Sequence, residues 1–250
     1  MSLLGKVFVV TGGASGIGLA TVRKLLQSSA TVHSIDKSDR VLTEDSQGGT
    51  LWSYPSVDVS SRASVTQTFK QIGKRNPKLD GLVNCAGIVK QHPSSVDSDD
   101  AFKQVWNVNL SGTWNATTDF IRIVEAGKAA SSKEAADVSI VNVGSMASFR
   151  GIPGIPGYVA SKHAVLGLTR AWAQEWGPLG VRVNLVGPGM VKTPMTEGDG
   201  NRDVEEVSTF PTVLKPFAEP EEIADIILFL LGDSSSYITG QAIQANGGWL

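Results

Sequence analysis

Near its N-terminus the chain carries an apolar strand that leads directly into a glycine-rich turn and then a helix. Residues Lys6 to Thr11 form a mainly β-branched run, typical of a buried parallel strand, and this run stops at Gly12. The apolar spacing from Leu19 to Leu26 predicts the helix. Glycines between a strand and a helix let a pyrophosphate approach the backbone, and the helix N-terminus offers amides and a positive dipole. The pattern therefore predicts a dinucleotide site, with a tight turn that binds nothing as the alternative; its candidate contacts are Gly12, Ser15, Gly16, Ile17 and Gly18.

Strand and helix patterns continue to alternate along the rest of the chain. Such alternation favours an α/β fold, a doubly wound parallel sheet with helices on both faces. With the first strand, the expected strands are seven; the others are Thr31–Asp36, Leu51–Tyr54 continued by Val57–Val59, Leu79–Asn84, Val138–Val143, Val181–Val186 and Gln241–Gln244. The further helices are expected at Arg62–Arg75, Asp99–Val108, Trp114–Val124, from Tyr158 to about Trp176, and Glu221–Leu231.

Size and composition narrow the class of protein. The 250 residues, with 41% hydrophobic and 18% charged side chains, fit one large α/β domain covering 1–250. A net charge of -2 gives no reason to expect nucleic acid or an anionic membrane as a partner. The apolar run from Ile223 to Leu231 is too short to span a bilayer, and residues 1–6 lack a signal-peptide pattern. With Cys85 as the one cysteine, we expect a cytoplasmic protein without disulfides.

An acidic residue ends the second strand. Asp36 follows Gly18 by 18 residues, where a carboxylate can accept hydrogen bonds from the adenosine ribose and repel a 2′-phosphate. Lys37 points the other way, because a cation beside the acid could meet that phosphate. We give Asp36 the greater weight and expect NAD as the cofactor.

A tyrosine and a lysine stand four residues apart where the long helix begins. Residues at this spacing share one face of a helix, so Lys162 is expected close to the phenol of Tyr158. A neighbouring positive charge lowers the pKa of a phenol, which makes it usable as a general base or acid. Ser145, at the end of the strand 138–143, is placed to hold a carbonyl or alcohol oxygen. The plain alternative is an ordinary helix pair with a solvated lysine.

With these residues in place, the chain resembles the short-chain dehydrogenase/reductase family over roughly residues 5 to 248. No single motif is specific, but their shared order and spacing make a chance match improbable. They are Thr11 to Gly18, Asp36, Asp58-Val59, Asn84-Cys85-Ala86-Gly87, Asn109, Ser145, Tyr158-Val159-Ala160-Ser161-Lys162, Pro188-Gly189 and Gly247-Gly248. Two positions depart from the family pattern: Cys85 replaces a second asparagine, and Asn246 stands where an aspartate is common.

The resemblance implies a single-domain Rossmann fold and a hydride transfer between NAD and a carbinol carbon. It also implies a catalytic tetrad of Asn109, Ser145, Tyr158 and Lys162, in which Tyr158 exchanges the hydroxyl proton and Lys162 lowers the tyrosine pKa and holds the ribose. Asn109, which from the sequence alone is equally a structural residue, would hold a proton-relay water. The remaining implied cofactor contacts are Asp58, Val59, Asn84, Ala86, Gly87, Pro188, Gly189, Val191 and Thr193, besides Tyr158 and Lys162.

The predicted substrate is a hydrophobic, cyclic or polycyclic secondary alcohol or ketone, because the expected pocket wall is mainly apolar. Sterol-like, terpenoid and polyketide secondary metabolites fit such a wall equally well. The expected wall, besides Ser145 and Tyr158, consists of Ala147, Phe149, Ile155, Met190, Met195 and Phe210. A long polar insertion at about 190–216 is expected to act as a substrate lid.

Two other function classes stay open at this stage: an NAD-binding sensor without turnover, and non-redox chemistry such as cyclisation or isomerisation. His33, His92 and His163 are scattered, so no metal site is expected. Apolar faces on helices 114–124 and 164–176 favour a homodimer or homotetramer, with Trp249-Leu250 at a subunit contact.

Overall fold

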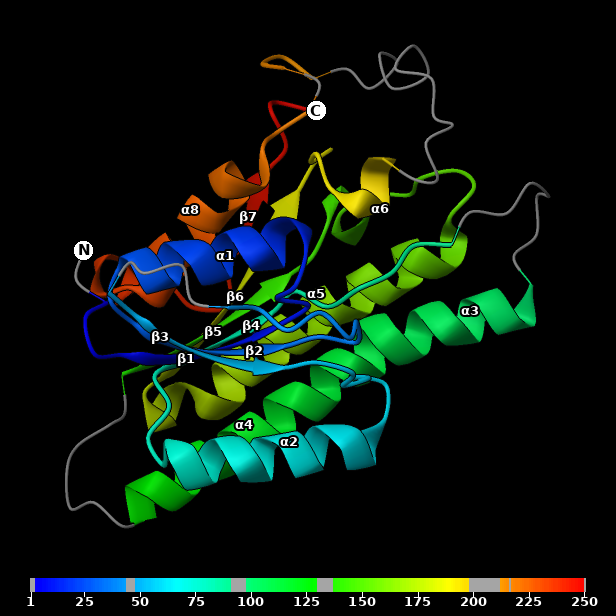
Figure 1. Cartoon of the computed structure of the whole chain (residues 1–250). Helices are drawn as coiled ribbons and strands as arrows, with labels where there is room; N and C mark the ends of the chain where they lie inside the picture. Colours follow the sequence, from blue (N-terminus) through cyan, green and yellow to red (C-terminus); the bar gives the residue numbers. More distant parts are fainter. Residues whose placement is uncertain are drawn as a thin grey trace.

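The computed structural model describes residues 3–43, 48–90, 98–129, 137–197, 212–215 and 217–249. Its centre is a parallel sheet in the order β3-β2-β1-β4-β5-β6-β7, which confirms the predicted seven-stranded doubly wound fold (Figure 1). The strands are β1 (Val7–Thr11), β2 (Thr31–Ile35), β3 (Thr50–Tyr54), β4 (Gly81–Asn84), β5 (Val138–Val143), β6 (Val181–Pro188) and β7 (Ala242–Ala245).

Helices cover both faces of the sheet. In Figure 1, α1 and α8 lie on one face, while α2, α4 and α5 lie on the other. Alternate side chains of β1 serve the two layers: Val9 packs with the α2 and α4 side, and Val10 packs with the α1 and α8 side. The helices are α1 (Gly16–Gln27), α2 (Arg62–Arg75), α3 (Asp99–Trp106), α4 (Thr113–Ala129), α5 (Pro156–Trp176), α6 (Pro194–Glu197) and α8 (Pro220–Leu231), with a wide π turn η1 (Asn107–Gly112) and short 3-10 turns η2 (Met146–Ser148), η3 (Gly177–Leu179) and η4 (Asp233–Ser235).

The strand order reverses between β1 and β4. From β1 the chain proceeds to β2 and β3 on one side, whereas β4 to β7 are added in order on the other. Loops that follow neighbouring strands on either side of this point diverge, which opens a crevice at the carboxyl ends of the strands. The turn after Thr11 and the turn after Asn84 border this crevice.

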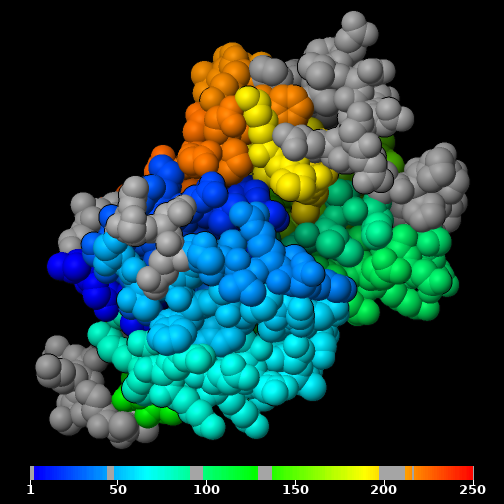
Figure 2. Space-filling view, viewed as in Figure 1, coloured from blue at the N-terminus to red at the C-terminus, as the bar shows by residue number. Residues whose placement is uncertain are grey.

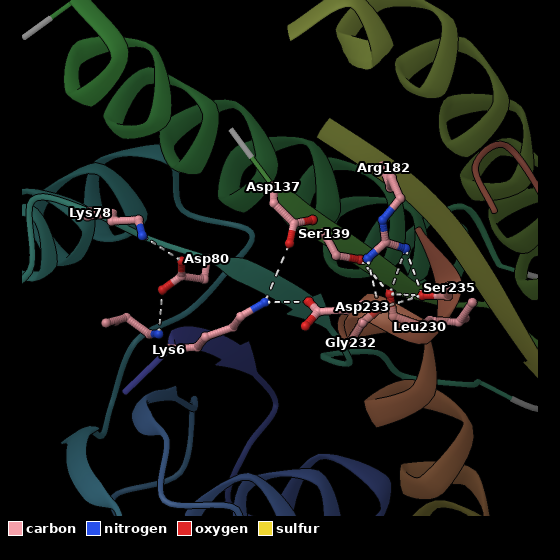
Figure 3. Close-up of polar contacts among 11 residues, drawn as sticks. Lys6, Lys78, Asp80, Asp137, Ser139, Arg182, Leu230, Gly232, Asp233 and Ser235 are labelled. Carbon is pink, nitrogen blue, oxygen red and sulfur yellow. Dashed lines mark hydrogen bonds and ion pairs between the residues drawn. The ribbon is translucent and has the colours of Figure 1, made fainter. Parts of the chain in front are cut away.

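The amino ends of the strands are tied together by polar contacts, drawn in Figure 3. Asp80 accepts a hydrogen bond from the Val7 backbone N–H at 2.8 Å, just before β4 begins. Arg182 of β6 donates to the Leu230 carbonyl and to Ser235 Oγ, both at 2.9 Å, and thereby fixes the end of α8. Lys6 pairs with Asp233 at 2.8 Å. This edge of the sheet is held by protein groups that bond to one another.

Several predicted boundaries are wrong. The third strand ends at Tyr54 and does not resume at Val57, because Pro55 has no N–H to donate and Ser56 takes a left-handed φ of 56°. Helix α4 extends to Ala129, beyond the predicted end at Val124, and β6 extends to Pro188. Residues 198–211 and 216 of the predicted insertion lie outside the described residues. None of the described helices is both long enough and apolar enough to cross a bilayer.

Candidate active site

A cleft of about 1360 Å³ lies at the carboxyl ends of the strands. The glycine turn after β1 lines one part of it, and Ser145, Tyr158 and Lys162 line another. In Figure 2 the yellow surface of the segment with α6 borders the green surface of the α3 segment, and both segments contribute lining residues. One continuous space therefore connects the predicted dinucleotide site with the predicted reacting groups.

Close backbone approach explains the glycines of the turn. Gly12 has a φ of 68°, and a Cβ placed on it would lie 2.8 Å from the Ala86 backbone. A Cβ on Gly18 would lie 2.0 Å from the Gly12 carbonyl oxygen, so Gly18 packs the start of α1 against the turn. Gly16 also has a positive φ, 49°, and lines the cleft at the N-terminus of α1. The turn thus presents backbone, without side chains, to a pyrophosphate, and its residues fit a dinucleotide.

The other side of the turn carries the acidic residues. The carboxylate of Asp36 accepts hydrogen bonds from the backbone N–H groups of Ala14 and Ser38, both at 2.9 Å, and it lines the cleft. Lys37 forms an ion pair with Asp58 at 2.8 Å. Burial acts to raise the pKa of Asp58, but hydrogen bonds from Lys37 and Ser60 lower it below its usual value. Lys37, the cation that could have met a 2′-phosphate, is therefore paired with a carboxylate.

Ser145 and Tyr158 meet at the other part of the cleft. Ser145 follows β5 and caps η2, accepting a hydrogen bond from the Ala147 N–H at 3.1 Å. Tyr158 stands in the first turn of α5, is partly buried, and hydrogen-bonds with Ser145. Burial raises the pKa of Tyr158 above its ordinary value, while the Ser145 hydrogen bond acts to lower it. Desolvation is the largest influence on the phenol, so the lowering of this pKa by Lys162 stays a prediction.

Lys162 is buried beneath the tyrosine. Its side chain is 6% exposed, and its Nζ lies 5.6 Å from the centroid of the Tyr158 ring. The Nζ donates a hydrogen bond to the Val143 carbonyl at 2.9 Å. Burial lowers the pKa of Lys162 to about 8, although the thiol of Cys85 acts in the opposite direction. Lys162 thus reaches the cleft as a buried amine with one hydrogen-bond acceptor among the described residues.

Asn109 occupies the π turn η1 and lies outside the cleft lining. Its Oδ1 accepts a hydrogen bond from the Ile88 N–H at 2.8 Å, and its Nδ2 donates to the Ile88 carbonyl at 3.0 Å and to Ser161 Oγ at 3.1 Å. Through Asn109 these bonds join the segment after β4 to α5. Asn109 and Ser161 are 52 positions apart in sequence. The side chain therefore performs the bridging role that the sequence left as one of two alternatives.

The other predicted cofactor contacts divide into two groups. Two of them do not line the cleft: Gly18 packs inside the turn, and Asn84 is buried and donates to Thr117 Oγ1 at 2.8 Å and to Asn142 Oδ1 at 2.9 Å. The rest do line it, namely Gly12, Ser15, Gly16, Ile17, Asp36, Asp58, Val59, Ala86, Gly87, Pro188, Gly189, Val191 and Thr193.

The predicted substrate wall needs correction. Ile155, Met190 and Met195 line the same cleft as Ser145. Ala147 is fully buried, and Phe149 packs in a separate cluster with Val165 and Leu185. Phe210 lies outside the described residues. Three further apolar residues line the cleft, namely Ile152, Pro153 and Trp249. The sequence shows that they are apolar but carries no signal that places them at the cleft.

The comparisons with known proteins agree with this geometry. A family model described as "Enoyl-(Acyl carrier protein) reductase" matches residues 12–250. The chain is 36% identical over 253 residues to the 3-oxoacyl-[acyl-carrier-protein] reductase FabG of Thermotoga maritima, covering 99% of each protein. The chain belongs to the short-chain dehydrogenase/reductase family. It is an oxidoreductase of alcohol or ketone groups that binds a nicotinamide cofactor.

Other members of the family have different stated activities. The chain is 32% identical over 249 residues to a 3-alpha-(or 20-beta)-hydroxysteroid dehydrogenase of Mycobacterium tuberculosis, covering 98% of this chain and 90% of that one. The crystal structure of levodione reductase superposes with a TM-score of 0.84 at 30% identity and covers 98% of each chain. Membership in the short-chain dehydrogenase/reductase family therefore fixes the reaction class and leaves the substrate open.

Proposed function

We propose that this short-chain dehydrogenase/reductase is an NAD-dependent enzyme that interconverts a hydrophobic, cyclic secondary alcohol and its ketone. The carrying observation is the hydrogen-bonded pair of Ser145 and Tyr158, which stands at the apolar part of a cleft whose other part holds Asp36. A hydride transfer needs both of these features, because the cofactor and the substrate must lie in the same cleft. A sterol-like, terpenoid or polyketide compound is consistent with the apolar lining.

The roles of the side chains follow from their chemistry. NAD, when bound, supplies the acceptor or donor of hydride. Tyr158 takes the hydroxyl proton in oxidation and returns it in reduction, while Ser145 hydrogen-bonds the same substrate oxygen. An ammonium has three N–H donors, and Lys162 uses one of them on Val143 among the described residues, so two remain for ribose hydroxyls. Asn109 acts as a positioning residue that fixes the Ile88 segment against α5.

The preference for NAD rests on the arrangement around Asp36. Its carboxylate lines the cleft, and a 2′-phosphate placed there would be repelled. Lys37 is paired with Asp58, and the nearby Arg40 donates to the Ala14 carbonyl at 3.2 Å. Both cations therefore already have protein partners, which disfavours their use on a 2′-phosphate. We expect kcat/KM to be at least about tenfold higher with NAD than with NADP, as one pairing with a like charge would cost.

Steady-state rates with both cofactors test this preference. Asp36→Ala should bring the two values of kcat/KM closer together, while Lys37→Ala, the adjacent control, should leave NAD ahead. Equal use of NAD and NADP by the unmodified enzyme would overturn the assignment of Asp36.

A second assay separates the proposed reaction from the two alternatives. Formation of NADH is followed at 340 nm with a panel of secondary alcohols, and products are identified by mass. A redox enzyme gives NADH and ketone in equal amounts. An isomerase or cyclase would give a product without NADH, and a sensor would bind NAD and give neither.

Two further proposals concern organisation. We propose that residues 1–250 form a single domain in which the segment after β6 closes the substrate part of the cleft, because Met190 and Met195 already line it.

We also propose self-association through α4 and α5: Trp114 is 48% exposed there and lies 5.8 Å, centroid to centroid, from Trp172. Light scattering should report a dimer or tetramer, and Trp114→Glu should shift it toward the monomer.

A further inference from the structure

The C-terminal segment of the described chain enters the cleft from the end of β7. Trp249 is one of the cleft-lining residues, although it is about ninety positions from Tyr158 in sequence. It is partly buried, and the guanidinium of Arg150 lies 5.4 Å from the centroid of its ring. Arg150 comes from the segment that follows Ser145 and η2. A cation over the ring face thus holds the indole at the wall of the cleft that Ser145 and Tyr158 also line.

The turn that delivers Trp249 is built around Asn246. Its Nδ2 donates to the Trp249 carbonyl at 2.8 Å and contacts Met146 Sδ at 3.1 Å, while its Oδ1 accepts from the Gly248 N–H at 3.0 Å. All three bonds use the amide side chain, and Met146 directly follows Ser145. Asn246 therefore connects the C-terminal turn with the residue beside a reacting group.

The backbone of this turn requires two consecutive glycines. Gly247 and Gly248 have φ values of 62° and 82°, a region that other residues rarely adopt. The Gly247 carbonyl accepts hydrogen bonds from Val213 at 2.8 Å and from Leu214 at 3.0 Å. A Cβ on Gly248 would lie 2.9 Å from the Val213 side chain. A turn fixed by so many specific contacts places the residue after it in one position.

The surroundings of Trp249 define what it can recognise. Besides Ser145 and Tyr158, the cleft lining includes the apolar residues Ile152, Pro153, Ile155, Met190 and Met195. A flat indole beside such side chains offers more contact to a ring than to a flexible chain, because a ring loses little conformational freedom when it lies against it. The carboxylates that line the cleft, Asp36 and Asp58, belong to the glycine-turn part.

We propose that Trp249 is a substrate-recognition residue that selects ring ketones and ring alcohols over open-chain ones, and that Asn246 is the positioning residue that holds it there. This inference rests on the proposed function, because it assumes that the substrate reacts at Ser145 and Tyr158. Within its own chain the C-terminal tryptophan is a wall of the cleft; the subunit contact expected for it from the sequence stays a prediction.

The kinetic test compares ketones of equal carbon number in the presence of NADH: cyclohexanone with 3-hexanone, and 2-decalone with 3-decanone. Trp249→Ala should raise KM for the cyclic members about tenfold, the value of a lost aromatic contact, and change KM for the open-chain members less than about twofold. The kcat should change little, because the indole carries no group that transfers a proton or a hydride. Trp249→Phe should retain most of the preference.

Two further variants isolate the cause. Asn246→Asp keeps the acceptor for Gly248 but removes the donor to the Trp249 carbonyl, so it should raise KM for cyclic ketones in the same direction. Trp52→Ala is the matched control: Trp52 is also a partly exposed tryptophan under an arginine, with Arg75 at 4.4 Å, but it lies on β3 outside the cleft lining. The Kd for NADH should be unchanged in all of them. An equal loss for cyclic and open-chain ketones would overturn the proposal.

A binding measurement keeps this inference separate from the proposed activity. The six tryptophans are labelled with 5-fluorotryptophan, and Trp249→Phe identifies the Trp249 resonance by its disappearance. Titration of 2-decalone into enzyme with NAD, a pair that cannot react, should move that resonance and leave the Trp52 resonance in place. Absence of turnover with every alcohol together with a moving Trp249 resonance would reject the proposed function alone. A Trp249 resonance that stays in place while 2-decalone saturates the enzyme would reject the inference.

Discussion

The amino and carboxyl edges of the central sheet differ in how far their polar side chains are hydrogen-bonded by other protein groups. At the amino edge, Lys6, Asp80 and Arg182 bond with neighbouring protein groups (Figure 3). At the carboxyl edge, Tyr158 hydrogen-bonds with Ser145, and buried Lys162 has one acceptor among the described residues. The same strands carry both edges, so the fold alone does not explain the contrast.

The difference shows where the molecule keeps binding capacity. A side chain that donates mainly to protein groups contributes to stability, whereas a buried amine with unused donors is costly unless a ligand accepts from them. The pKa of Lys162, lowered by burial to about 8, is the measurable sign of that cost. The amino edge is therefore expected to respond to mutation in stability, and the carboxyl edge in activity.

The largest expected effect is at the carboxyl edge. Tyr158→Phe removes one hydroxyl and should lower kcat by about 100- to 10,000-fold, the range for loss of a general acid or base. The Kd for NADH, measured by fluorescence, and the melting temperature should stay close to the unmodified values. Activity within tenfold of the unmodified enzyme would mean that another group exchanges the proton.

A pH series tests the burial cost of Lys162. Its pKa is about 8 in the folded protein, below the ordinary 10.5, so the unfolded chain holds the proton longer between these values. The free energy of unfolding of the cofactor-free protein, relative to Lys162→Met, should therefore rise by up to about 3 kcal/mol between pH 8 and 10.5. Below pH 8 the difference should be constant. A difference that falls as the pH rises would contradict the lowered pKa.

The amino edge should show the reverse pattern. Arg182→Met removes charged hydrogen bonds to the Leu230 carbonyl and Ser235, and should lower the free energy of unfolding by about 2 kcal/mol. Urea unfolding measures this loss. The KM values for cofactor and substrate should not change at a temperature where the variant is folded. A changed KM with unchanged stability would show that the two edges are coupled.

The smallest effect is expected from Lys6. Its partners Asp137 and Asp233 are 62% and 70% exposed, so solvent screens both ion pairs. Lys6→Met should cost less than about 1 kcal/mol, and less again at high salt. A loss as large as that of Arg182→Met would mean that exposure does not govern the contribution of these pairs.

Local patterns were enough to predict much of this protein. The alternation of strands and helices predicted the sheet. Helix α2 begins and ends at the predicted residues, Arg62–Arg75, and the Ser61 side chain caps its start by accepting a hydrogen bond from the Ser64 N–H. The sequence also predicted the glycine turn between the first strand and helix, and the shared helix face of Tyr158 and Lys162. Each of these features depends on residues within a few positions, where backbone geometry fixes the outcome.

Only the tertiary structure decided which distant residues meet. The sequence placed Ala147 and Phe149 in the substrate wall because they are apolar and follow Ser145, yet Ala147 is fully buried and the partly buried Phe149 packs against Val165 and Leu185. For Trp249 it predicted a subunit contact, which stays a prediction, but it did not reveal that the turn at Asn246 brings this residue to the cleft of its own chain. The apolar character of a side chain predicts that it is buried, but not which residues it contacts. Its neighbours are determined by the register of the strands and the path of the loops between them.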